Sequence, residues 1–376
     1  MHDTVSALHV TRLFLLSHPT ISVAPLAIIG GTASIYSAAL SHSSSTLTPL
    51  SVVYLFLLAL NYSIMPRISK KFVHPKTNKK SLALVEEMVK FSMGVGGFLI
   101  TDNFSSLKKW TLQSSLIAAG LPSALYAIQG VFTYTAYQNL DSLTFNGLNQ
   151  MKTLSAALCC FLVLGKVQSH MQILALALLS ITPWIFEGKP AKLMKRGQNE
   201  AKHVASDVDL KRRFIWGIVP CLGATLLSGL AGAFSQKSLQ MVVGSMDRNA
   251  YFYSAEISLS TAVCLFVSMG VESLNPRRRN VEIIKDNPTG VKHAKYFDYW
   301  SWKTLIPITL KATGGILTAL VHKHSGSVMK GFSLVLGLVI SALLQTALDG
   351  EDLGMSQIFG TALILLSSWL HFTSPP

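Results

Sequence analysis

The chain has 376 residues, of which 50% are hydrophobic and only 13% are charged, and its mean hydropathy is +0.42. A soluble domain usually carries about 25% charged residues, so this composition excludes an ordinary soluble protein. The net charge of +14 resides mostly in short polar stretches between apolar segments. That distribution is typical of membrane-topology signals and argues against nucleic-acid binding, because no DNA- or RNA-binding motif accompanies it.

The first 48 residues differ from the rest of the chain. The apolar run "ISVAPLAIIGGTASIYSAAL" follows Arg12 and precedes a serine-rich stretch, and no acidic residue occurs between Asp3 and Glu86. Such a segment fits a transit peptide, a signal or anchor, or an additional membrane helix. Residues 1–48 are therefore predicted to form an N-terminal extension, and these three alternatives stay open.

Ten apolar stretches follow, and each has about the length that crosses a bilayer as a helix. The stretches are 49–66, 82–101, 113–137, 141–163, 169–187, 213–239, 250–271, 301–322, 328–349 and 354–373. The sequence therefore predicts an all-α polytopic membrane protein with ten transmembrane helices. A polar, basic loop at 188–212 separates the fifth helix from the sixth.

A short motif indicates that these helices form two related halves. The segment "MKTLSAAL" (151–158) is echoed by "MKGFSLVL" (329–336), and each copy lies in the fourth helix of a set of five. Many transporters are built from two such repeats, with the binding site between them near the middle of the membrane. We therefore expect two five-helix inverted repeats, at 49–187 and 213–373.

Ionisable side chains inside membrane helices are costly, and they are therefore functional candidates. Some of them have a simple structural explanation. Glu86 or Glu87 can pair with Lys90, which lies three or four residues further along the same helix. Lys311 can extend toward the membrane surface or pair with Glu256.

Lys152 and Lys330 have no acidic residue within one helical turn. Two unpaired ammonium groups that face one cavity suit a multiply charged anion, and lysine is a common phosphate ligand. We therefore predict that both lysines bind the phosphate part of a substrate. The polar and aromatic groups nearby that can read the rest of the ligand are Tyr126, Gln129, Asn146, Asn149, Gln150, Asn249, Tyr251 and Tyr253.

No catalytic or nucleotide-hydrolysing motif such as GxxxxGK(S/T), HExxH or GxSxG occurs in the sequence. The four cysteines lie in apolar segments, without a CxxC partner or a histidine at zinc-ligand spacing. We therefore expect a protein that is not an enzyme and that needs neither a metal nor a cofactor.

Several segments together resemble the nucleotide-sugar transporters, in the branch that holds the CMP-sialic acid, UDP-galactose and UDP-N-acetylglucosamine carriers. The resemblance extends over about 300 residues, from residue 49 to the end of the chain. The segments that carry it are "LPSALYAIQ" (121–129), "NLDSLTFNGLNQMKTLSAAL" (139–158), "SGLAGAFSQK" (228–237), "RN" (248–249), "GGILTALVHK" (314–323) and "VMKGFS" (328–333).

This resemblance implies a ten-helix bundle of the drug/metabolite transporter type. It implies exchange of a cytosolic nucleotide sugar for a luminal nucleoside monophosphate by alternating access. It also implies a multi-pass protein of the Golgi membrane, with the endoplasmic reticulum or a plastid envelope as alternatives. In the family, the lysines that match Lys152 and Lys330 approach the phosphates.

The resemblance also implies a substrate-binding set. Its remaining members are Tyr126, Asn249 and Tyr253 near the nucleoside, and Ser228, Gly232 and Thr318 in the pocket lining. Gln129 and Asn149 join this set because they are polar residues close to the same segments.

Four positions depart from the family pattern. Gly130 replaces an asparagine and Phe145 replaces a tyrosine, and both positions serve the nucleoside in relatives. Gln236 stands where relatives often have glutamate, and Lys311 is an added cation. We therefore expect a nucleotide-linked substrate and favour a UDP-sugar, while CMP-sialic acid is not supported.

Membrane orientation and two other functions stay open. The basic loops after the first, fifth and seventh helices favour a cytosolic location by the positive-inside rule, whereas the resemblance places them in the lumen. One alternative function is transport of a sugar phosphate or another organic anion, and another is a non-transporting membrane subunit of a glycosylation complex. GxxxG-like spacing is compatible with a homodimer.

Overall fold

The computed structural model describes residues 48–74, 77–102, 107, 110–140, 145, 148–186, 212–241, 248–274, 297–349 and 355–374. The predicted N-terminal extension up to residue 47 and nearly all of the basic loop at 188–212 lie outside these residues. Every regular element within them is a helix, which confirms the all-α fold class for the described part of the chain.

The helices lie close to the stretches that hydropathy predicts. In chain order they are α3 (Pro49–Phe72), α4 (Lys79–Thr101), α5 (Leu112–Ser115), η2 (Leu116–Gly120), α6 (Leu121–Asn139), α8 (Lys152–Leu164), α9 (His170–Phe186), η3 (Phe214–Ile218), α12 (Val219–Gln240), α13 (Ala250–Leu274), η4 (Trp302–Thr304), α15 (Leu305–His324), α16 (Ser327–Asp349) and α17 (Met355–Thr373).

Local sequence explains several helix ends. The side chains of Thr48 and Asn78 accept hydrogen bonds from backbone N–H groups in the first turns of α3 and α4. Gly165 ends α8 with a φ of 68°, the left-handed conformation that glycine adopts without strain. Pro122 and Pro220 each follow a π-helical turn, η2 and η3, which makes room for a ring that cannot donate a backbone hydrogen bond.

Seven helical segments of the described chain are long and apolar enough to cross a membrane, and they identify a multi-pass membrane protein. The helix α4 is not among them, because Glu86, Glu87 and Lys90 interrupt its apolar stretch. Neither are α8 and α9, whose apolar lengths are shorter. The predicted fourth span began at residue 141, but α8 begins only at Lys152 and has 13 residues.

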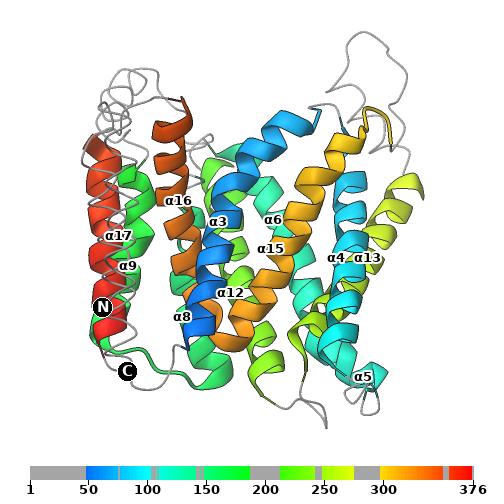
Figure 1. Cartoon of the computed structure of the whole chain (residues 1–376), viewed down its shortest axis with the longest axis horizontal. Helices are drawn as coiled ribbons and strands as arrows, with labels where there is room; N and C mark the ends of the chain where they lie inside the picture. The colour runs from blue at the N-terminus through cyan, green and yellow to red at the C-terminus, as the bar shows by residue number, and fades with distance from the viewer. Residues whose placement is uncertain are drawn as a thin grey trace, which may run out of the picture.

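The helices pack as a bundle in which segments from the two ends of the sequence alternate (Figure 1). The helix α3 packs between α15 and α16, α12 packs against α6 and α8, and the pairs α4–α13 and α9–α17 flank this centre. Large apolar side chains are exposed on most helices, for example Phe132, Leu162 and Val263. A surface of this kind is suited to contact with lipid rather than water.

Small residues allow the closest approaches at the centre of the bundle. A Cβ atom added to Gly229 of α12 would lie 2.6 Å from the backbone carbonyl carbon of Ser155 in α8. A Cβ atom added to Gly331 of α16 would lie 2.5 Å from a side-chain carbon of Thr153, also in α8. Close backbone contact through small residues is the usual way in which membrane helices pack, and here it joins α8, α12 and α16.

Candidate functional site

Lys152 and Lys330 lie at the starts of two neighbouring helices. Lys152 is the first residue of α8, and Lys330 lies in the first turn of α16. The residues that follow them, Thr153 and Gly331, are in direct contact. As a result the two half-buried lysines lie close enough for their ammonium groups to repel each other.

Neither lysine has an acidic partner in the described part of the chain, where the ion pairs join other residues. The other groups that act electrostatically on this pair are the Cys221 thiol and the buried imidazole of His322, and neither supplies a permanent negative charge. The N-terminus of a helix adds a partial positive charge of its own. Two uncompensated cations in this arrangement are chemically suited to the oxygen atoms of a phosphate.

Gln236 of α12 supports the start of α16 beside this site. Its Oε1 accepts a hydrogen bond of 2.7 Å from the backbone N–H of Ser327 and one of 3.4 Å from the Cys160 thiol. Its Nε2 donates to Gln240 at 2.9 Å. Because this residue is a neutral amide, it fixes the turn without neutralising the lysines, as a glutamate here would.

Two tyrosines from different helices converge on α12. Tyr126 of α6 and Tyr253 of α13 both lie against Ser235. Tyr253 is fully buried, and neither its hydroxyl nor that of Ser235 has a hydrogen-bond partner within the described residues. Buried hydroxyls without partners are uncommon, and a ligand can satisfy them. The structure therefore brings these two predicted nucleoside residues together.

Asn249, which was predicted to lie near the nucleoside, makes hydrogen bonds within the protein in this structure. It precedes α13, and its Oδ1 accepts a hydrogen bond of 2.9 Å from the backbone N–H of Tyr251, as a helix-capping residue does. Its Nδ2 donates to Thr101 of α4 at 2.9 Å. Both polar atoms of the side chain are thus engaged within the protein.

The remaining predicted residues are distributed around the same helices. Gly232 of α12 lies against the side chain of Ser327 and lets the start of α16 approach, and the half-buried Ser228 lies one turn earlier on α12. Thr318 of α15 donates its hydroxyl hydrogen to the Gly314 carbonyl at 2.8 Å. Gln129 and Asn149 are half-buried.

Several other charged residues of the membrane helices form ion pairs. Lys90 binds Glu87 at 2.7 Å, which confirms the predicted pairing within α4. The prediction that Lys311 pairs with Glu256 is wrong, because Lys311 of α15 faces α4 and binds Glu86 there at 2.5 Å.

Glu256 has its own partners, and sequence reasoning missed them. Its carboxylate accepts hydrogen bonds of 3.0 Å from both Arg248 Nε and Trp110 Nε1. Arg248 is completely buried, and it precedes α13 by two residues, where helical periodicity does not predict a contact. Its place in the "RN" segment was the one available signal.

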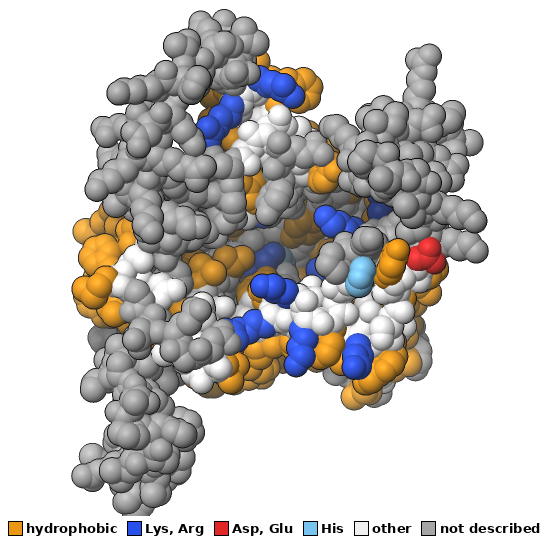
Figure 2. All heavy atoms as spheres, turned by 90° about the horizontal axis from the view of Figure 1, so that it is seen from above, with side chains coloured by type: hydrophobic (Ala, Val, Ile, Leu, Met, Phe, Trp, Pro, Cys, Tyr) orange, Lys and Arg blue, Asp and Glu red, His pale blue; other side chains and the backbone are white. Residues whose placement is uncertain are grey.

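The two ends of the bundle differ. Figure 2 shows lysine and arginine side chains gathered around a hollowed centre at one end, the end where α3 finishes and α15 begins. At the other end, polar bonds tie α8, α12, α13 and α15 together. They are Lys323 Nζ to the Arg248 carbonyl at 2.9 Å, Gln240 Nε2 to the His322 carbonyl at 2.8 Å, and Lys166 Nζ to Gln240 Oε1 at 2.8 Å. The centre is therefore hollow toward the basic end, and polar bonds join the helix ends at the other end.

These features identify a multi-pass membrane protein with two unpaired lysines between its helices. The profile of the family described as "Nucleotide-sugar transporter" matches residues 43–372. The chain belongs to the nucleotide-sugar transporter family. Its function is accordingly the transport of nucleotide sugars, and the family and its named members are transporters rather than enzymes.

Curated relatives match most of the chain. The UDP-N-acetylglucosamine transporter ROCK1 of Arabidopsis thaliana is 34% identical over 336 residues, which cover 89% of this chain and 95% of that protein. The UDP-galactose transporter of Schizosaccharomyces pombe is 26% identical over 84% of this chain and 83% of its own length. The UDP-N-acetylglucosamine transporter of Mus musculus is 25% identical over 68% of this chain and 70% of its own.

A solved crystal structure shares the fold. It is 10% identical in sequence and has a TM-score of 0.58, and the match covers 86% of this chain and 98% of that one. At this identity the likeness concerns the fold alone.

Proposed function

We propose that the protein exchanges a cytosolic UDP-sugar for a luminal nucleoside monophosphate across the Golgi membrane by alternating access. The observation that carries this proposal is the pair of uncompensated cations, Lys152 and Lys330, on touching helix starts. Both the nucleotide sugar and the monophosphate carry phosphate oxygens that these cations can bind.

The choice of a UDP-sugar comes from the relatives. Those named above transport UDP-N-acetylglucosamine or UDP-galactose, and the first of them matches nearly the whole chain. UDP-N-acetylglucosamine is therefore the substrate to test first. The same matches favour a nucleotide sugar over the sugar phosphate or other organic anion that the sequence left open.

Alternating access rests on a two-repeat architecture, which the packing supports. The proposed repeats are α3, α4, α6, α8 and α9, followed by α12, α13, α15, α16 and α17. By order in the repeats, α3 corresponds to α12, α4 to α13, α6 to α15, α8 to α16 and α9 to α17. Under this correspondence the α3–α15, α3–α16 and α4–α15 contacts become α12–α6, α12–α8 and α13–α6, and these contacts are also present. The α4–α13, α8–α16 and α9–α17 contacts map onto themselves. A site between α8 and α16 then lies on the symmetry axis of the transporter.

Obligate exchange follows from the charges. When the cavity is empty, the ammonium groups of Lys152 and Lys330 repel each other, and no anion compensates their charge. Uncompensated buried charge is strongly unfavourable. A bound phosphate removes this cost, so the loaded protein changes conformation more readily than the empty one.

The proposal is tested with the full chain in lipid vesicles. Uptake of labelled UDP-N-acetylglucosamine should require preloading with UMP, and UDP-galactose should compete more effectively than GDP- or CMP-sugars. Equal uptake into empty vesicles would exclude obligate exchange. If no nucleotide sugar entered under either condition, a non-transporting subunit would become the better description.

The expected location and oligomeric state are tested separately. The tagged chain should colocalise with Golgi markers, and its mass in detergent tests the expected homodimer.

A further inference from the structure

Among the ion pairs of the described helices, the one between Lys311 and Glu86 has the most exposed cation. The Lys311 side chain is 56% exposed, whereas those of Lys90 and Arg248 are 11% and 0% exposed. A charged side chain inside a membrane protein almost always faces the interior of the bundle or a water-filled cavity rather than lipid. The exposed ammonium group of Lys311 is therefore expected to face water inside the bundle.

Helical spacing places Lys311 on the face of α15 that leads to the central lysines. Lys311 is the seventh residue of α15, about 9 Å along the helix from the basic end where α15 begins. Thr318 and His322 follow it by two and three helical turns, so the three side chains lie on one face. His322 in turn lies close to Lys330. This face therefore extends from the basic end to the lysine pair.

The neighbours of this face turn it away from lipid. On the opposite side of α15, near its start, Leu305 and Ile306 are exposed apolar side chains, as lipid contact requires. The helix α3 packs on one flank, where Asn61 donates a hydrogen bond of 2.8 Å to the Leu310 carbonyl. The helix α4 packs on the other flank, where Glu86 binds the lysine. The face of Lys311 is thus turned toward the hollowed centre of Figure 2.

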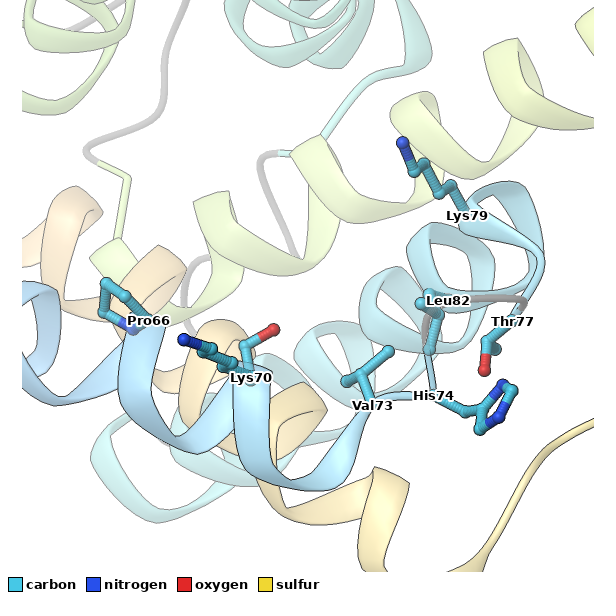
Figure 3. Close-up of a pocket in the computed structure, with 8 residues that line it drawn as sticks. Pro66, Lys70, Val73, His74, Thr77, Lys79 and Leu82 are labelled. Carbon is cyan, nitrogen blue, oxygen red and sulfur yellow. The ribbon is translucent and has the colours of Figure 1, made fainter.

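The basic residues at the rim do not form an anion site of their own. An open pocket of about 480 Å³ lies there between the ends of α3 and α4, but its Lys70 and Lys79 side chains point away from each other (Figure 3). Such lysines supply a diffuse positive potential that attracts anions to this end of the bundle. Inward of the rim, Lys311 is the next lysine of α15.

The partner of Lys311 can be exchanged easily. An ion pair with a well-exposed member contributes little to stability, because water solvates the separated charges. Phosphate oxygens accept charge-assisted hydrogen bonds from an ammonium group as the Glu86 carboxylate does. His322 lies about 16 Å further along α15 than Lys311, which exceeds the reach of a lysine side chain. Lys311 therefore suits a phosphate that has entered the hollow and has not yet reached Lys330.

We infer that Lys311 is an entry-site residue, which binds the phosphate groups of a nucleotide on their way from the basic end to Lys152 and Lys330. Glu86 occupies Lys311 when the path is empty. Lys311 then sets the rate at which nucleotide reaches the central site and not the final affinity. This role rests on the proposed function, since both have the same ligand.

The test measures, by stopped flow, the association of fluorescently labelled UDP with the purified full chain in detergent. Lys311→Gln should slow association about tenfold at low salt, the lower end of the range for electrostatic steering. The equilibrium affinity should stay within about twofold, as expected when a charge on the path and not in the site is removed. The difference in rate should disappear near 1 M salt, where the Debye length is about 3 Å.

The partner variant separates this role from a purely structural ion pair. Glu86→Gln frees Lys311 and removes a charge that repels phosphate, so it should speed association. Lys311→Arg keeps the positive charge and should associate like the natural protein. If Lys311→Gln and Glu86→Gln slowed association equally, the pair would be structural only and the entry role would be wrong. A loss of equilibrium affinity as large as the loss of rate would also contradict it.

A matched control distinguishes a specific path from general attraction to positive charge. Lys303→Gln removes one charge from the same end of the bundle, where the Lys303 ammonium group lies over the Trp302 ring, 5.9 Å from its centroid. This variant should change the association rate much less than Lys311→Gln. Equal slowing in the two variants would overturn the entry role.

The binding assay and the vesicle assay fail independently. If UDP binds and Lys311→Gln slows its association while vesicles show no exchange, obligate exchange is wrong and the entry role stands. If the natural protein exchanges nucleotides and Lys311→Gln associates at the natural rate, the entry role alone is wrong. If the natural protein did not bind UDP, both would be wrong. Circular dichroism and gel filtration check that each variant is folded.

Discussion

Two groups of charged side chains inside the same helix bundle behave in opposite ways. At Glu87–Lys90, Glu86–Lys311 and Arg248–Glu256, each cation binds a carboxylate at 3.0 Å or less. At Lys152 and Lys330, two cations are neighbours and neither has a carboxylate partner in the described residues. Unpaired charge is costly inside a membrane protein, so pairing of a buried cation with a carboxylate indicates a structural role, whereas a pair of like charges suits an anionic ligand.

The buried ion pair between Arg248 and Glu256 should give the largest effect on stability. The substitution Arg248→Met leaves the Glu256 carboxylate buried with a single indole donor, Trp110. Loss of one partner from a buried pair typically costs about 3 to 5 kcal/mol. We therefore expect a large fall in the unfolding temperature of the purified protein.

A double variant distinguishes the cost of an orphaned charge from the loss of packing. Arg248→Met combined with Glu256→Leu removes both charges, and it should recover most of the stability lost in the single variant. If the single variant were as stable as the natural protein, the structural role assigned to this pair would be wrong.

Substitutions in the like-charged pair, Lys152 and Lys330, should weaken ligand binding without lowering stability, unlike those in the Arg248–Glu256 pair. Lys152→Gln or Lys330→Gln should weaken nucleotide binding by about 1.5 to 3 kcal/mol, the usual range for a hydrogen bond to a charged group, or roughly 10- to 150-fold. Each change also removes a repulsion, so the unfolding temperature without ligand should be unchanged or higher. A titration of thermal stability with UMP measures both quantities in one experiment.

Measuring UMP binding and stability in the same lysine variants distinguishes a ligand-binding role from a structural role. If either lysine variant bound UMP as well as the natural protein, the phosphate-binding role of that lysine would be excluded. If the variant were instead strongly destabilised without ligand, the lysine would belong with the structural charges.

The sequence-based predictions agree with the structure for features set by residues close together in the chain, and they fail for features set by helix packing. Hydropathy located the helices, and the three-residue spacing identified the Glu87–Lys90 pair, because both depend on residues close together in the chain. The start of α8 at Lys152 was missed, because no proline or charged residue between residues 142 and 151 marks a break in the stretch. The partners of Lys311 and Glu256 were also missed, because they depend on which helices pack together.

The repeated "MK" motif was the one sequence feature that predicted a contact between distant parts of the chain. A repeated motif relates positions that are distant in the sequence, and here the structure places Lys152 and Lys330 side by side. No such repeat marks His322, which lies close to Lys330 and whose buried Nε2 has no hydrogen-bond partner among the described residues. A lone histidine in an apolar helix gives no sign of its neighbours until the fold is known.

The two ion pairs of α4 allow the smallest and most controlled test. The side chains of Lys90 and Glu87 are 11% and 10% exposed, whereas those of Lys311 and Glu86 are 56% and 13% exposed. A well-exposed ion pair contributes about 0 to 1 kcal/mol. Because the Lys311 ammonium group is mostly solvated, we expect Lys311→Met to change the unfolding free energy by about this amount. We expect Lys90→Met to cost more, because both members of its pair are shielded from water. The stem of Lys90 also packs against Gly315, so Lys90→Met keeps the contact and changes mainly the charge. Equal costs for the two substitutions would show that exposure of the lysine does not set the strength of these pairs.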